Sequence, residues 1–351
     1  MRPRRTPRSV RFFGFVALTA ALSFSSFRGG DRSVVASERS GSNEARQGSG
    51  EFRLERQFPL DRGGTFVLDS AAGRVDVVGD SPSGVSLTVT SNREDTDKRF
   101  EFLFDNTPQS VKLTIKRRDR FEVFGDWLRG GLQITVHVPN DAMVDARTAG
   151  GGIDASRLGN ARLRTSGGSV HAEMIAGDLD GHTSGGSIRV RDVRGRASVE
   201  TSGGSIDASD ITGSLRAHTS GGGIHINNVA GDVDAGTSGG SVDARGIGGR
   251  VAAHTSGGSI SVAFATGNNH GGDLSTSGGG VRAAIDPGVA LSIDASTSGG
   301  SVTADVPVTV QGNLGRRKLQ GHLNGGGEML RLHTSGGSIR ISSASTSTAR
   351  R

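Results

Sequence analysis

Three histidines occupy one repeated position of the sequence and are the first candidates for metal chemistry. His182, His218 and His254 each precede a Thr-Ser-Gly-Gly motif, with Glu200 and Gly236 at the intervening equivalent positions. If each repeat adds one parallel strand, histidines two strands apart are separated by about 9.6 Å. A zinc ion needs imidazole nitrogens at about 2.0 Å. We therefore expect a solvated polar face here, without a metal site or cofactor.

Calcium binding would need aspartates in the turns of successive repeats. β-rolls with coils of about 18 residues bind Ca²⁺ through Gly-Gly-x-Gly-x-Asp turns. The turns here read Gly-Gly-Ser-Ile, and no aspartate occupies that ligand position in successive repeats. Calcium takes about six to eight oxygen ligands, so a calcium-binding solenoid is only a minor alternative.

The repeated serine and the charged residues argue against catalysis. The serine of Thr-Ser-Gly-Gly recurs in almost every repeat, outside any Gly-x-Ser-x-Gly context. Glycan-cleaving enzymes place paired carboxylates in a cleft, but no unique cluster of ionisable residues interrupts the repeats. The lysines are only Lys98, Lys112, Lys116 and Lys318. We expect no catalytic residues and no enzymatic activity.

One aromatic cluster is the candidate partner-binding site. Phe121, Phe124 and Trp127 lie together in the segment RDRFEVFGDWLRGG. Tryptophan is frequent at binding hot spots, and sugars stack on aromatic rings. The competing interpretation, which we favour, is that these side chains cover the end of the repeat array. The chain has no tyrosine, which disfavours a broad lectin surface.

The elements that position these residues follow from a repeat of Thr-Ser-Gly-Gly-[Ser/Gly]-[Ile/Val]. A Thr-Ala-Gly-Gly-Gly-Ile variant opens the series at Thr148. The steps from Thr165 to Thr255 are each 18 residues; the next two are 21 and the last is 37. A fixed period of this length is typical of a solenoid, in which each unit packs on its neighbours. The motif threonines are Thr165, Thr183, Thr201, Thr219, Thr237, Thr255, Thr276, Thr297 and Thr334.

Each repeat contains two short stretches in which apolar and polar residues alternate, as in Ile188 to Val190 and Ala197 to Val199. Alternation with a period of two indicates half-buried strands. Two strands per unit predict an all-β fold, a two-sided parallel β-solenoid of about 18-residue coils.

The alternation of apolar and polar residues places the motif threonine on the buried side of its strand. Its hydroxyl then needs a partner such as a backbone carbonyl in the next coil. A flat β-solenoid can bind ice through an outer array of threonine hydroxyls. Because the threonines here are expected to point inward and the outer faces are charged, ice binding is only a minor alternative. We expect the Gly-Gly pair to supply positive φ in the turn.

The sequence predicts five segments. Residues 1–36 form a signal peptide cleaved after residue 25 or 36, because an arginine-rich start precedes the apolar run from Phe12 to Phe24. Residues 37–50 are a disordered linker, and residues 51–147 form an irregular β cap. Residues 148–342 form the repeat solenoid. Residues 343–351 are a disordered tail.

Charge and composition narrow the function classes. Residues 1–36 carry seven arginines and one aspartate, which account for the whole formal charge of +6. The mature chain is thus neutral and has no global attraction for nucleic acid.

The chain has no cysteine, which excludes disulfides, thiolate metal sites and cysteine lipidation. The full chain has 57 glycines among 351 residues. No transmembrane segment is expected after cleavage.

The run Gln133 to Pro139, the repeated TSGGSI and the closing Asn324-Gly325-Gly326-Gly327 followed by TSGGSI at Thr334 resemble a known family. It is the bacterial putative-adhesin family of β-strand repeats, a domain family of unknown function. The resemblance covers about residues 60–342. It implies an exported, non-enzymatic repeat protein and supplies no catalytic residues.

We therefore expect an exported, glycine-rich repeat protein with an adhesin-like or structural role at the bacterial cell envelope. It would be periplasmic, at the cell surface or secreted. Its partner would be an envelope or surface protein or a glycan. The alternative is an envelope-stress or signalling accessory that docks one membrane partner through its N-terminal portion.

Overall fold

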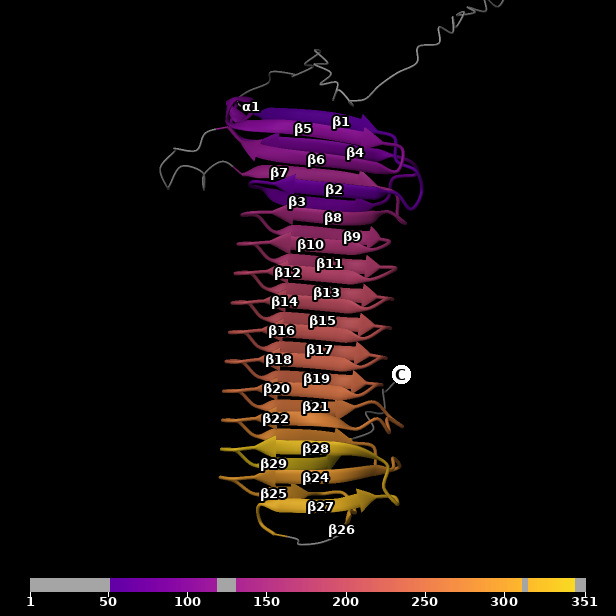
Figure 1. Cartoon of the computed structure of the whole chain (residues 1–351), viewed down its shortest axis with the longest axis vertical. Coiled ribbons are helices and arrows are strands. Elements are labelled where there is room, and N and C mark those ends of the chain that lie inside the picture. Colours follow the sequence, from indigo (N-terminus) through magenta and orange to yellow (C-terminus); the bar gives the residue numbers. More distant parts are fainter. Residues whose placement is uncertain (1–50, 119–130, 311–314, 345–351) are drawn as a thin grey trace, which may run out of the picture. The chain divides into compact units, whose positions relative to one another are not determined.

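The computed structural model describes residues 51–118, 131–310 and 315–344. All of them belong to one of the two units into which the chain divides, residues 45–351. The predicted signal peptide, the linker and the aromatic residues Phe121, Phe124 and Trp127 lie outside the described residues. The described part consists of two sheets that face each other across a thin apolar core, with one short helix, α1 (Thr96–Arg99). Figure 1 shows the strands stacked as successive coils.

The two sheets have 14 and 15 strands among the described residues. Sheet 1 has the spatial order β1 (Phe52–Phe58), β4 (Val85–Ser91), β7 (Leu132–Val138), β3 (Arg74–Gly79), β9 (Ile153–Leu158), β11 (Val170–Ile175), β13 (Ile188–Val193), β15 (Ile206–Ile211), β17 (Ile224–Val229), β19 (Val242–Ile247), β21 (Ile260–Phe264), β23 (Val281–Ile285), β29 (Ile339–Ser343), β25 (Val302–Ala304). Sheet 2 has the spatial order β5 (Phe100–Thr107), β6 (Ser110–Arg117), β2 (Thr65–Ser70), β8 (Met143–Thr148), β10 (Ala161–Thr165), β12 (Leu179–Thr183), β14 (Ala197–Thr201), β16 (Leu215–Thr219), β18 (Val233–Thr237), β20 (Val251–Thr255), β22 (Gly272–Thr276), β28 (Glu328–Thr334), β24 (Leu291–Thr297), β27 (Lys318–Leu323), β26 (Thr309–Val310).

The alternation of apolar and polar residues explains why each repeat gives one strand to each sheet. In β13, Ile188 and Val190 are buried while Arg189 between them is exposed. In β14, Ala197 and Val199 are buried in the same way. Strands from successive repeats pair in parallel and in register, so that identical positions stack. The predicted fold class, a two-sided parallel β-solenoid, is confirmed.

The threonine of each motif is buried and links two coils. Thr183 Oγ1 donates a hydrogen bond to the carbonyl oxygen of Gly168 at 2.7 Å and accepts one from Gly186 N at 3.3 Å. The acceptor lies in the preceding coil, not in the next coil as the sequence suggested. The same pair of bonds recurs in the following coil at Thr201. The hydroxyls therefore form a ladder along one edge of the core.

The Gly-Gly pairs are required by close packing, and the expectation of positive φ was wrong. None of the glycines with positive φ belongs to such a pair among the described residues. A Cβ on the second glycine, Gly204, would instead overlap the carbonyl oxygen of Gly186 in the preceding coil. A Cβ on the first glycine, Gly203, would lie 3.3 Å from the carbonyl oxygen of Gly185. Stacked turns at strand spacing leave no room for a side chain at the second position.

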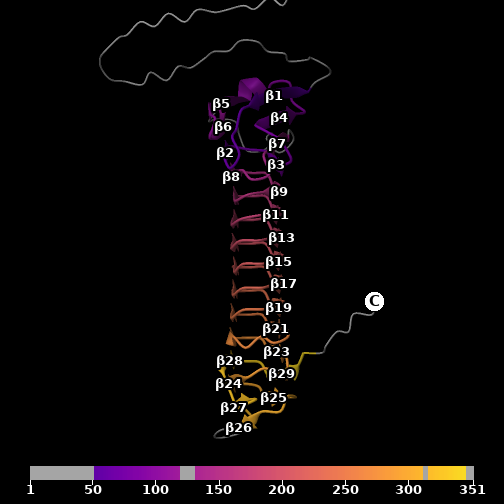
Figure 2. The same cartoon turned by 90° about the vertical axis from the view of Figure 1, so that its right-hand side faces the viewer.

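Coils at both ends of the stack are out of sequence order. The coil β28/β29 lies between β22/β23 and β24/β25, although it is the last along the chain. At the other end, β2/β3 lies between β6/β7 and β8/β9. Figure 2 shows the resulting stack from its narrow side. The stacking order of the coils therefore differs from their order along the chain at both ends.

Antiparallel strands close the N-terminal end of the stack. β1 pairs with β4, and β5 pairs with β6 in an antiparallel hairpin. Across the two sheets, Phe52 stacks on Phe102 with ring centroids 5.6 Å apart, and Phe58 lies 5.4 Å from Phe104. These rings cover the apolar core where the coils end, which protects it from other chains.

Asp95, just before the short helix, pairs with arginines on both sides of it, Arg93 at 3.6 Å and Arg99. Arg99 Nε donates to Asp95 Oδ2 at 2.6 Å. This hydrogen bond lowers the pKa of the Asp95 carboxyl below its usual value. The pair holds the turn that leads from β4 into β5.

Candidate functional site

The outer face of sheet 2 is a flat array of polar side chains in two columns. The first column contains Arg162, Asp180, Arg216 and Asp234, which succeed one another through the register of the strands, with Ser198 between the two pairs. Arg162 Nε lies 3.3 Å from Asp180, and Arg216 lies 3.8 Å from Asp234. Both signs of charge thus recur along the face at strand spacing.

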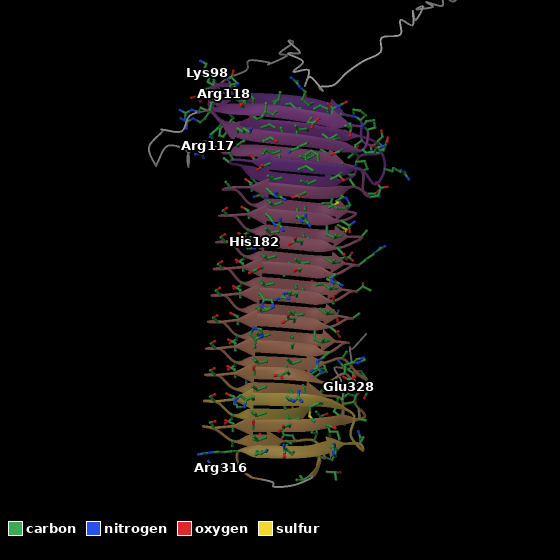
Figure 3. The ribbon with its side chains drawn as sticks, viewed as in Figure 1. Lys98, Arg117, Arg118, His182, Arg316 and Glu328 are labelled. Carbon is green, nitrogen blue, oxygen red and sulfur yellow. The ribbon has the colours of Figure 1, made fainter. Side chains whose placement is uncertain are left out.

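The second column contains the histidines. Its members are Arg164, His182, Glu200, His218, Gly236, His254 and Ser275. His182 is the first histidine of this column and is labelled in Figure 3. Its Nδ1 lies 4.0 Å from Glu200 Oε2. The His218 and His254 rings have centroids only 5.6 Å apart. The separation of about 9.6 Å expected from strand spacing does not hold for the rings, because they lean together over Gly236.

The outer face of sheet 1 carries a comparable column of charges. Arg189 lies 4.0 Å from Asp207, which neighbours it in β15. Nearer the N-terminal portion, Arg74 donates to Asp154 at 2.8 Å and to Asp76 at 3.3 Å. Asp154, followed by Asp76, raises the pKa of the Arg74 guanidinium. This arginine therefore stays charged, which suits ion pairing rather than proton transfer.

A ladder of left-handed residues marks one position of sheet 1 in six successive coils, from Arg157 in β9 to Gly246 in β19. Asp192, Asp210 and Asn228 have φ of 53°, 58° and 55°, and Gly246 continues the position at 68°. Asn and Asp tolerate this conformation better than most residues, and glycine adopts it freely. Asn228 Nδ2 donates to Asp210 Oδ1 at 3.1 Å. The aspartates thus have a structural role in a bulge, which the 18-residue spacing could have indicated.

Calcium and catalytic sites find no support in the described residues. Within residues 51–118, 131–310 and 315–344, no group of three or more His, Cys, Asp or Glu side chains could hold a metal ion. The motif serines are exposed at the turn, as Ser184, Ser202 and Ser220 illustrate. Each recurs in identical surroundings at every coil, which gives none of them the distinct environment of a nucleophile.

A hollow of about 530 Å³ lies in the N-terminal portion. It is formed where the end of β1 meets the loop before β4, and Phe58, Leu60 and Val85 give it an apolar side. Its polar lining comes from Gln57, Asp61, Ser81, Ser83 and Ser86. No pattern in the sequence indicates this hollow, because it depends on the antiparallel pairing of β1 with β4.

No helix among the described residues is long and apolar enough to cross a membrane. The sequence has no match among curated proteins.

Three solved structures illustrate what the chain is similar to. A "putative adhesin" from Bacteroides fragilis is 10% identical, covers 82% of this chain and 96% of its own, and has a TM-score of 0.32. A "putative lipid binding protein" from Parabacteroides distasonis is 12% identical, with the same coverage and a TM-score of 0.35. A "putative cell adhesion protein" from Clostridium sporogenes is 10% identical, covers 83% and 100%, and has a TM-score of 0.24. At these values the three structures assign neither ligand nor function to this chain.

The family is established by the sequence itself. A family model described as Toastrack DUF4097 matches residues 67–342. The match spans most of the chain, from the first coil β2/β3 to the last strand β29. The chain therefore belongs to the Toastrack DUF4097 family.

Proposed function

We propose that this protein is an exported, non-enzymatic binding module of the bacterial cell envelope, with an adhesin-like or structural role. Export rests on the arginine-rich start and the apolar run from Phe12 to Phe24. The domain boundaries expected from the sequence, with a cap over residues 51–147 and a solenoid over residues 148–342, are part of this proposal.

The observation that carries the proposal is the periodic outer face of sheet 2. Arg162, Asp180, Arg216 and Asp234 stand in one column, with charges of both signs at fixed spacing. A rigid scaffold presents these groups without the entropy cost of ordering them on contact. Exposed ion pairs of this kind contribute little to stability, typically under about 1 kcal/mol. Their regular placement is therefore better explained by contact with an extended partner, a glycan or a surface protein, than by stability.

A second candidate function is favoured by the hollow beside Phe58, Leu60 and Val85. A signalling accessory that docks one membrane partner would use a single concave site rather than a repeated face. The aromatic residues Phe121, Phe124 and Trp127 remain proposed contacts for such a partner, since they follow β6 in the same N-terminal portion.

Protease treatment of intact native cells, followed by fractionation and immunoblotting, tests the proposed location. Loss of the band without lysis supports surface display. Protection until the envelope is opened supports a periplasmic binding module and favours the single-partner function. Recovery of the uncleaved chain in the cytoplasmic fraction would contradict export, and with it the proposed function.

A further inference from the structure

Gly236 stands at an outward position of β18 and is nevertheless buried. Its neighbours in register are His218 on one side and His254 on the other. The two rings lie 5.6 Å apart and are tilted by 53°. They lean over the glycine from both sides, which explains why a residue of the outer face is covered.

The space above Gly236 is bordered by one nitrogen of each ring. A Cβ at Gly236 would lie 2.8 Å from His218 Nδ1 and 2.6 Å from His254 Cε1, with His254 Nε2 closer still. One nitrogen of each imidazole thus borders the same space beside Gly236, into which a side chain at residue 236 would project. At the equivalent position between His182 and His218 stands Glu200 in place of a glycine.

A carboxylate lies behind the first of these histidines. Asp234 Oδ1 is 3.3 Å from His218 Nε2, the ring nitrogen that does not border the space, although the contact lacks hydrogen-bond geometry and Nε2 has no hydrogen-bond partner among the described residues. A proton on Nε2 leaves the lone pair of Nδ1 directed at the space. Metal-binding histidines commonly have a carboxylate beside the nitrogen that does not bind the metal, because it fixes the tautomer and raises ligand basicity. Arg216, 3.8 Å from Asp234, faces the same carboxylate.

We propose that His218 Nδ1 and His254 Nε2 form a two-histidine site for a late divalent transition metal, namely Zn²⁺, Ni²⁺ or Cu²⁺. Imidazole suits these ions, whereas Ca²⁺ and Mg²⁺ select oxygen ligands. Binding requires the two rings to turn until both nitrogens lie at the metal distance of about 2.0–2.1 Å, with water as the remaining ligands. This inference stands apart from the proposed envelope function, because it depends only on the geometry of three coils.

The test is isothermal titration calorimetry of the mature chain, free of any histidine tag, with ZnCl₂ and NiCl₂ at pH 7.5. One metal per chain is expected. His218→Ala and His254→Ala should each weaken binding at least tenfold. Gly236→Ala keeps both histidines but fills the space, and it should weaken binding as much. His182→Ala, in the same column beside Glu200, is the matched control and should bind like the unchanged chain.

Two results would overturn the proposal. One is no binding by the unchanged chain at millimolar metal. The other is an equal loss with His182→Ala, which would mean diffuse binding by any surface histidine. Imidazole nitrogen NMR of the unchanged chain gives an independent readout that needs no variant to fold. Zn²⁺ should shift the resonances of His218 and His254 alone, and shifts spread over the other histidines would contradict the site.

Discussion

Thr334 donates its hydroxyl hydrogen to the carbonyl oxygen of Gly279 at 2.7 Å, although the two residues are 55 positions apart. In the regular coils the same bond spans 15 residues, as between Thr219 and Gly204 at 2.8 Å. Thr297, earlier in the chain, bonds in turn to Gly337. The threonine ladder therefore runs unbroken through the inserted coil β28/β29, and the final coil is held on both sides.

Insertion of a terminal coil changes how the solenoid can open. In a linear array of repeats, unfolding begins at an end coil that has one neighbour. Here the first and the last coil along the chain, β2/β3 and β28/β29, each have two neighbours. Each of these two coils must break its contacts with both neighbouring coils before it can unfold. We expect this arrangement to suppress fraying at both ends.

Thr219→Val should destabilise the chain by about 1–3 kcal/mol, because it leaves the Gly204 carbonyl oxygen and Gly222 N–H without their partner. Valine keeps the shape of the side chain and isolates the effect of the hydroxyl. Urea unfolding followed by circular dichroism measures the change. Ser220→Ala, at the exposed neighbouring position, is the control and should change stability by less than about 0.5 kcal/mol. Equal effects of the two substitutions would refute the role of the ladder.

Gly204→Ala should be more damaging than any threonine substitution. A Cβ there would overlap the Gly186 carbonyl oxygen, so the two coils would have to separate locally. Gly203→Ala, next to it in the same turn, meets a carbonyl oxygen only at 3.3 Å and should be milder. Melting temperatures of the two variants test this order, and a reversed order would contradict the close-packing explanation.

Deletion of residues 183–200 should leave a folded chain. It removes one whole period and joins His182 to Thr201, so the remaining strands meet in the same register. Stability should fall only by the contribution of one coil. Deletion of the nine residues 183–191 removes half a coil and should abolish cooperative unfolding in urea. If both deletions unfold the chain equally, the coils are not interchangeable units.

A chain that ends at residue 327 lacks β28 and β29 and should lose order beyond β23. Strands β24 and β25 stack only through the missing coil, as the pairing of β24 with β28 and of β25 with β29 shows. Hydrogen exchange should become fast in residues 290–327 and stay slow in the coils before β20. A chain that ends at residue 344 keeps all described strands and serves as the control. Unchanged protection of residues 290–327 in the shorter chain would contradict the insertion.

The sequence could predict the strands, the buried threonines and the two polar faces, because each follows from the alternation of apolar and polar residues within one repeat. The stacking order of the coils could not be predicted from the sequence. The motifs at Thr276, Thr297 and Thr334 are nearly identical, so each can stack on either of the others. Loop lengths and the antiparallel strands β26 and β27 decide the outcome. The sequence resembles a domain family of unknown function with TSGGSI-type repeats. The match over residues 67–342 confirms the family, but it does not show that the TSGGSI repeat defines that family.

Side-chain geometry across coils was also beyond the sequence. The histidines stand two strands apart as expected, but Gly236 lets the rings of His218 and His254 approach each other. Likewise, Phe52 and Phe58 meet Phe102 and Phe104 only because β1 and β5 close opposite sheets. Such contacts join positions far apart in sequence, which alternation within one repeat does not describe.

The central claim, that the repeated faces are the binding surface, can be tested with isolated envelopes from cells that lack the chain. Purified mature chain should bind them saturably. Arg216→Ala with Asp234→Ala on sheet 2 should weaken binding, whereas Ser83→Trp, which fills the N-terminal hollow, should leave it unchanged. Circular dichroism confirms that each variant is folded. Binding that survives the sheet 2 substitutions and is lost with Ser83→Trp would contradict the account and assign recognition to the N-terminal portion.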